Sequence, residues 1–160
     1  MLDKIFFWGG FLLIVLYIGH LIYQKEQVVK HGTEFFLKLA PRDPRSMMQG
    51  DYMSLDYTVT RQLQRQKTTK RQGTIKVYLN KQNVASLTAS KGANKTLLLQ
   101  YKNRRGRTQI GPNAFFIQEG NDKYYNDAKY GIFRADNNGH VVLMALADTK
   151  RKKIIPPPKH

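Results

Sequence analysis

The chain has no cysteine among its 160 residues, which excludes disulfide bonds, thiolate metal sites and a cysteine nucleophile. Acidic side chains are scarce as well: 11 Asp and Glu stand against 27 Lys and Arg, giving a formal net charge of +16. A chain this basic is attracted to polyanions such as nucleic acid, anionic lipid or anionic polysaccharide. A hydrophobic content of 41%, with 11% aromatic residues, argues against disorder for most of the chain.

Patterns that announce a known chemistry are missing from the sequence too. No glycine-rich loop of the kind that cradles phosphate is present. Four histidines are scattered without the spacing of metal ligands: His20, His31, His140 and His160. We therefore expect no metal, no cofactor and a protein that is not an enzyme.

Residues 5–23 carry no Asp, Glu, Lys or Arg, and as a helix they would span roughly 28 Å, close to the thickness of a bilayer's hydrocarbon core. Trp8 lies near one end and Tyr23 near the other, where aromatic rings favour the membrane interface. The following residues, QKEQVVKHG, offer no small-residue cleavage site of a signal peptide. The run therefore predicts an uncleaved, single-pass membrane helix that continues as a stalk toward residue 30.

The charges that flank this helix leave its orientation open. Only Asp3, Lys4 and the terminal amine precede it. Four basic residues follow it within about twenty positions: Lys25, Lys30, Lys38 and Arg42. The positive-inside rule would place the following domain in the cytoplasm, although long domains can translocate regardless of such charges.

The rest of the chain has the alternating pattern of β-strands. In residues 51–60, Met53, Leu55, Tyr57 and Val59 point to one face, which predicts a strand with one buried side. Similar short runs predict further strands at 33–39, 74–80, 84–90, 96–102, 114–117, 130–135 and 140–148. The sequence Asp136-Asn137-Asn138-Gly139 predicts a hairpin turn between the last two strands.

These elements predict a mainly β fold, in which a single N-terminal transmembrane helix is followed by a compact antiparallel β-barrel or sandwich-like domain. We divide the chain into an anchor and stalk at 1–30, a β domain at 31–149 and a basic, proline-rich, disordered tail at 150–160. A short helix is expected near 121–129. The basic segment 61–73 is expected to be a solvated loop.

The most distinctive motif lies where residues 51–60 begin. It consists of Gly50, Asp51, Tyr52, Leu55 and Tyr57, preceded by the run Pro41-Arg42-Asp43-Pro44-Arg45. In these residues the sequence resembles the GDYXXLXY family. A second block also resembles that family, with Glu119, Gly120, Tyr130, Gly131, Phe133, Arg134 and Gly139 in matching order. The resemblance covers most of the β domain.

The resemblance implies a bacterial, membrane-anchored protein that acts beside a polytopic protein of the inner membrane, and it implies no catalytic residues. It also favours a periplasmic domain. We therefore expect a non-enzymatic accessory module in which Leu55 and Tyr57 belong to the core. Asp51 and Tyr52, together with Asp43, Arg45 and Gly50, would form a junction or a partner surface.

Two other functions remain open. Lys102, Arg104, Arg105 and Arg107 follow Tyr101 and could bind a polyanion, with anionic lipid favoured over nucleic acid in a tethered protein. Ser46, followed by Met47 and a Gly-Asp pair, is similar to the nucleophile region of type I signal peptidases, with Lys102 as the candidate base. Ser46 stands too close to Gly50 for that pattern, which makes the hydrolase the weaker alternative.

Overall fold

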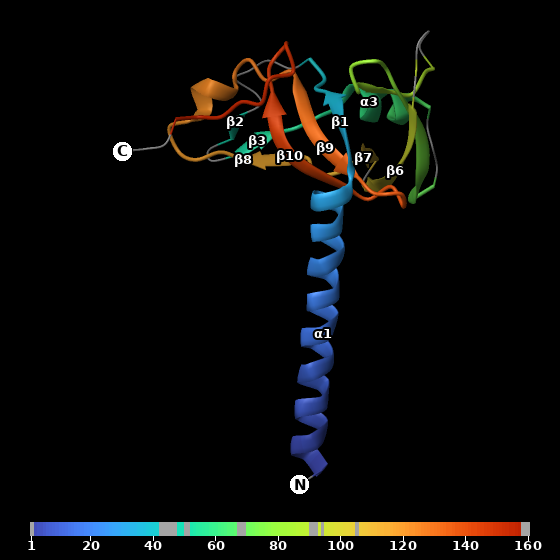
Figure 1. The fold of residues 1–160 in the computed structure, drawn as a ribbon, viewed down its shortest axis with the longest axis vertical. Helices are drawn as coiled ribbons and strands as arrows, with labels where there is room; N and C mark the ends of the chain where they lie inside the picture. Colours follow the sequence, from blue (N-terminus) through green and yellow to red (C-terminus); the bar gives the residue numbers. More distant parts are fainter. Residues whose placement is uncertain are drawn as a thin grey trace.

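The computed structural model describes residues 2–41, 48–49, 52–66, 70–89, 93, 95–104 and 106–157. Figure 1 shows one long helix that stands away from a β-rich domain. Helix α1 (Leu2–His31) is long and apolar enough between Phe7 and His31 to cross a membrane, and its most apolar stretch is not buried by the domain. The predicted helix and its continuation beyond the apolar run are thus present, because one unbroken helix reaches the first strand; that it crosses a membrane stays a prediction.

Three antiparallel sheets form the domain. The first contains β1 (Thr33–Lys38), β9 (Tyr130–Ala135) and β10 (Val141–Ala147), in the order β1-β9-β10. The second contains β2 (Met48–Gln49), β3 (Tyr52–Ser54) and β8 (Ala114–Phe116), in that order. The third contains β5 (Ala85–Ser86), β4 (Gln72–Leu79), β6 (Lys95–Arg104) and β7 (Arg107–Gln109), in the order β5-β4-β6-β7. The sheets curl into a half-barrel, so the mainly β fold class is confirmed.

The inner side of the half-barrel holds a single large core. Phe35 of β1 and Phe133 of β9 are opposite each other in the antiparallel register, are fully buried, and stack with ring centroids 5.7 Å apart. Leu99 of β6 and Leu146 of β10 bring the other strands into the same cluster. Each such side chain contributes about 2 kcal/mol through removal of apolar surface from water.

Most predicted strands are present close to their expected positions. The runs at 33–39, 74–80, 96–102, 114–117, 130–135 and 140–148 correspond to β1, β4, β6, β8, β9 and β10. The run at 84–90 is shorter than expected, because only Ala85 and Ser86 pair with β4. The predicted turn after β9 is confirmed, and Gly139 adopts the positive φ of 83° that glycine tolerates. The short helix expected near 121–129 is the 3₁₀ helix η1 (Asp122–Tyr125).

The strand predicted at 51–60 is wrong in its second half. Strand β3 ends at Ser54, and helix α3 (Thr58–Arg65) replaces both the end of that strand and the start of the loop predicted at 61–73. The helix buries Val59, Thr60 and Leu63, which lie on one helical face. The alternation from Met53 to Val59 has the period of a strand, which explains the prediction. Val59 and Leu63, four residues apart, have the spacing of one helical face instead.

Part of the tail predicted to be disordered is ordered. The backbone turns back after β10, where Arg151 N–H donates to the Asp148 carbonyl and Ile154 N–H donates to the Leu146 carbonyl. Lys153 forms a bridge with Ala147, and Ile154 packs on the core. The basic run is thus followed by Ile154, whose side chain packs on the core. The composition of the tail alone did not indicate this contact.

The junction between α1 and the domain is tightly packed. Val28 is buried, and the N–H of Gly32 donates to the Val28 carbonyl at 2.9 Å. Arg134 of β9 donates from Nη1 to the carbonyl of Val29, and its Nη2 lies 3.6 Å from the carboxylate of Glu34, its partner across the β1–β9 pair. A side chain at Gly32 would collide with the Val28 carbonyl and lie 3.1 Å from the Ala135 carbonyl. The backbone therefore has no space for a side chain at Gly32, where the helix meets the domain.

Replacing this glycine should loosen the junction. We expect Gly32→Ala to lower the free energy of unfolding of the domain by about 1–3 kcal/mol, because backbone atoms must shift to accept the methyl group. Thermal unfolding of the full chain in detergent, followed by circular dichroism in the β region, measures the change. Gly10→Ala is the control, since a Cβ at Gly10 meets nothing within 4 Å. Equal transitions for both variants would contradict the tight junction.

Candidate functional site

The motif strand β3 lies beside β8 and carries an exposed aromatic pair. Tyr52 is 37% exposed and pairs with Phe116, which is 81% exposed. Their ring centroids are 6.4 Å apart with tilted planes. Asp43, Arg45, Gly50 and Asp51 lie outside the described residues, so the described part of the motif begins at Tyr52.

The other two motif side chains are buried. The N–H of Leu55 donates to the Asn113 carbonyl at 2.8 Å, and the Tyr57 hydroxyl donates to the Pro112 carbonyl at 2.8 Å. The Tyr57 ring meets Phe133 edge to face at 5.4 Å. Burial, reinforced by the negative charge of Asp56, raises the pKa of Tyr57 well above its ordinary value. The predicted placement of Leu55 and Tyr57 in the core is therefore confirmed.

Through Phe133, the first motif contacts the second block. Gly131 leaves space for that ring, because a Cβ at position 131 would lie 2.8 Å from Cε2 of Phe133. Tyr130 packs edge to face on Phe36 at 6.4 Å. Arg134, four residues after Tyr130, is the side chain that contacts α1. Gly131 thus makes room in the core and Arg134 contacts α1, whereas Tyr130 packs with Phe36 in a smaller cluster.

Glu119 and Gly120 lie apart from these contacts. Both are exposed in the turn between β8 and η1, where Gly120 has a φ of 81°. A Cβ at Gly120 would meet nothing within 4 Å, so the backbone conformation rather than crowding favours glycine there. This pair follows strand β8 but contributes nothing to the core.

The β9–β10 turn docks on β6 next to α1. Asp136 accepts the N–H groups of Asn138 and His140 at 2.9 and 2.8 Å, and its other oxygen lies 2.9 Å from Nδ1 of His140. Partial burial acts to raise the pKa of Asp136, but the hydrogen bonds and charge of His140 and the Asn138 N–H outweigh it, so the pKa is lowered. The N–H of Gln100 donates to the Gly139 carbonyl at 2.9 Å, which fixes the turn on the third sheet.

The basic residues predicted to bind polyanions also come together. Arg104 of β6 faces Arg107 of β7 in the strand register, and Lys102 lies on the same strand pair. The structure adds Arg71, whose carbonyl accepts the Asn103 N–H at 2.7 Å, and Lys25 of α1, which lines a hollow together with Lys102. Arg105 lies outside the described residues. The contribution of Lys25 was not predicted, because nothing in the sequence places the stalk against β6.

Two surface features stand out among the described residues. Within them, no group of three or more His, Asp or Glu side chains could hold a metal ion. Ser46, the candidate nucleophile, lies outside the described residues, so its distance from Lys102 is not defined. What the described residues do present is the exposed Tyr52–Phe116 pair and the basic cluster near α1.

The structure thus defines a class of protein: a β half-barrel fixed to a single apolar helix, with a tyrosine-bearing motif strand at its surface. The chain belongs to the GDYXXLXY protein family, which matches residues 14–146 and therefore covers α1 from residue 14 onward and the domain as far as β10. Comparisons with curated proteins and with solved structures found no significant match.

The buried Tyr57 makes a pH-dependent prediction. Above pH 10 the tyrosine ionises in the unfolded chain but stays protonated in the folded one, so the unfolded state binds fewer protons and stability falls as pH rises. One such group costs about 1.4 kcal/mol per pH unit. We expect Tyr57→Phe to cost about 1 kcal/mol at pH 7 through the lost hydrogen bond, and to lose less stability than the native chain between pH 10 and 11.

Denaturant unfolding of the full chain in detergent, at pH 7, 10 and 11, measures these differences. Tyr78→Phe is the matched control, because Tyr78 is only half-buried in β4 and should leave the alkaline loss in place. A Tyr57→Phe variant that weakens as steeply as the native chain above pH 10 would contradict the assignment.

Proposed function

We propose that this protein is a non-enzymatic accessory module, anchored in the bacterial inner membrane by α1, that binds a polytopic membrane protein through the surface around Tyr52 and Phe116. The observation that carries the proposal is the exposure of this aromatic pair beside the motif strand. A phenyl ring that is 81% exposed is costly in water and is common where one protein binds another.

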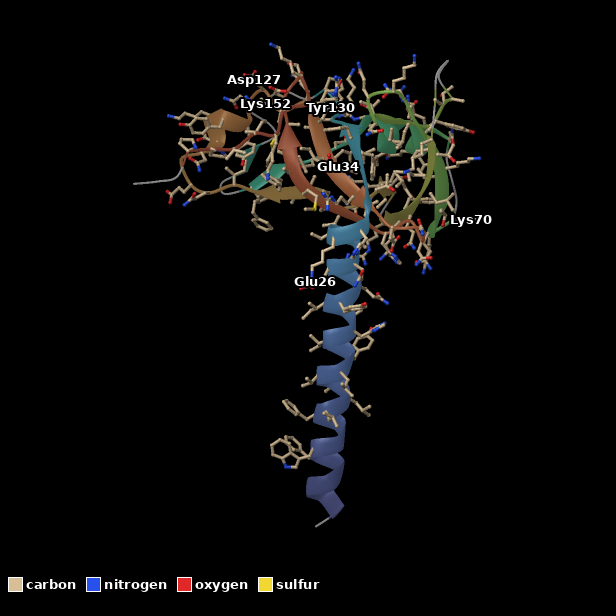
Figure 2. All side chains as sticks on the ribbon, in the orientation of Figure 1. Glu26, Glu34, Lys70, Asp127, Tyr130 and Lys152 are labelled. Atoms are coloured by element: carbon tan, nitrogen blue, oxygen red, sulfur yellow. The ribbon has the colours of Figure 1, made fainter. Side chains whose placement is uncertain are left out.

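The position of the pair supports a partner that lies in the membrane. We call the side of the domain from which α1 leaves the helix-side face. It carries β8 and Lys70 (Figures 1 and 2). Because Arg134 and Gly32 fix the domain on α1, this face stays directed toward the bilayer that α1 is proposed to cross. The short loops of a polytopic protein would be within reach of β8.

We place the domain in the periplasm, where family resemblance favours it, even though Lys25 and Lys30 follow the span. The lack of native cysteine makes this directly testable. In intact cells with a permeable outer membrane, a membrane-impermeant thiol reagent should label Lys81→Cys, which is exposed in the turn after β4. Labelling only after the inner membrane is disrupted would place the domain in the cytoplasm.

The partner surface is tested by crosslinking in living cells. A photoreactive phenylalanine analogue at position 116 should form a discrete protein adduct in the membrane fraction. Tyr52→Ala in the same chain should reduce that adduct about tenfold, as expected for the loss of one central aromatic contact. The same analogue at Leu98, an exposed apolar position on β6, is the control and should form no such adduct.

Adducts to lipid alone at position 116 would contradict a protein partner. Unfolding of the Tyr52→Ala domain would show that the motif tyrosine stabilises the fold rather than recognises a partner. Circular dichroism of the purified variants separates these results from a true loss of binding.

A further inference from the structure

A hollow lies where the stalk of α1 passes the third sheet. It encloses about 170 Å³ and is lined by Lys25 of α1, by Gln100 and Lys102 of β6, by Gln109 of β7, and by Gly139 and His140 of the β9–β10 turn. The main-chain bond from Gln100 to Gly139 and the Asp136 bonds to His140 hold its walls in place. The hollow is therefore built from four elements, and these bonds fix the turn against β6.

Its charge is positive and uncompensated. Within the described part of the chain, no carboxylate lies within ion-pair distance of Lys25 or Lys102, and no carboxylate lines this hollow. On the far side of Lys102, a wider hollow is lined by Arg71, Asn103 and Arg104. The cations thus form a track that begins at the stalk and follows β6 outward.

The acid that lines the adjoining hollow is already hydrogen-bonded. Asp136 lies in the adjoining hollow, and its two oxygens are bound to His140 and Asn138. Those bonds lower the pKa of Asp136, so it stays ionised at neutral pH, but its charge is directed at the histidine ring. An anion that enters between Lys25 and Lys102 would meet two ammonium groups before it meets this carboxylate.

The level of the hollow along α1 indicates which anion can reach it. The adjoining hollow, about 260 Å³, shares Lys25 and His140 with the first and is also lined by His20 and Tyr23, at the end of the apolar run. Lys25 is two residues, or roughly 3 Å, beyond Tyr23. In Figure 2, Glu26, the next residue along α1, lies on the stalk just below the domain. A bilayer crossed by residues 5–23 would place its phosphates at this height.

We infer that this hollow binds the phosphate of an anionic phospholipid, with Lys25 and Lys102 neutralising its charge and the acyl chains lying along the apolar face of α1. The inference rests on membrane anchoring by α1 but not on a protein partner. It also gives the basic residues predicted to bind polyanions a specific ligand. Arg71 and Arg104 attract further anionic headgroups around the first, which strengthens binding at low ionic strength.

The test is lipid binding by the purified full chain in detergent, followed by native mass spectrometry with added phosphatidylglycerol or phosphatidylcholine. We expect tighter binding of phosphatidylglycerol. Lys25→Gln and Lys102→Gln should each weaken it about fivefold, and the double variant more, because each lysine near an anionic headgroup contributes a similar attraction. Lys102→Arg should retain most of the binding.

The matched control is the double variant Lys150→Gln with Lys152→Gln. It removes the same net charge from exposed lysines, of which Lys152 lies on the side opposite α1 (Figure 2). This control should bind phosphatidylglycerol like the native chain. An equal loss in control and test variants would mean nonspecific charge attraction and would overturn the site.

Two further arms distinguish other sources of phosphate. Glycerol 3-phosphate that competes at the concentration of the lipid would show a soluble ligand and overturn the lipid assignment. Single-stranded DNA that binds the same chain, with a loss in the Lys25→Gln and Lys102→Gln variants, would assign the site to nucleic acid instead. Crosslinking at position 116 is independent of all these readouts, so failure here leaves the partner proposal standing and the reverse also holds.

Discussion

The hydrogen bond from Arg134 to the last turn of α1 joins the β domain to the helix, and the placement of every surface feature relative to that helix depends on it. Arg134 belongs to β9, the central strand of the first sheet, and its guanidinium contacts the Val29 carbonyl and the Glu34 carboxylate. Helix ends expose carbonyl groups that need donors, and here the domain supplies one. Gly32 then allows the chain to pass from helix to strand without a linker. The helix and the half-barrel therefore behave as one body.

This fixed junction matters for the two surface features, the Tyr52–Phe116 pair and the basic track along β6. On a freely tumbling domain, neither feature would have a defined direction relative to α1. Fixed on a short stalk, β8 and the basic track would keep a constant position relative to the bilayer that α1 is proposed to cross. The proposed partner and the proposed lipid would thus occupy different parts of one membrane-directed surface.

Much of the fold could be predicted from local patterns. The uncharged run predicted α1, and Phe35 with Leu37 and the Asn-Gly turn at 138–139 predicted β1 and the β9–β10 hairpin. Residues 58–65 could not be assigned in this way, because Tyr57 and Val59 fit a strand and a helix start equally well. Only the core contact of Leu63 decides between them. Ile154 gave no local signal either, since its packing depends on a turn at 148–152 that overlaps the basic run 150–153.

The residues of the candidate sites also differ in whether local sequence patterns could predict their placement. Burial of Leu55 and Tyr57 followed from alternation, and the cluster of Lys102 and Arg104 followed from sequence proximity. The role of Arg134 and the approach of Lys25 to β6 depend on contacts between residues about 75 to 105 positions apart, which periodicity does not report.

The central claim is that α1 and the domain form one rigid unit. Because the chain has no cysteine, two introduced labels are unique: Leu13→Cys on the exposed surface of α1 and Lys81→Cys in the turn after β4. Double electron–electron resonance between spin labels at these positions, in lipid nanodiscs, should give a single narrow distance distribution that broadens when Arg134 is replaced by Leu. A broad distribution in the otherwise native chain would contradict the account.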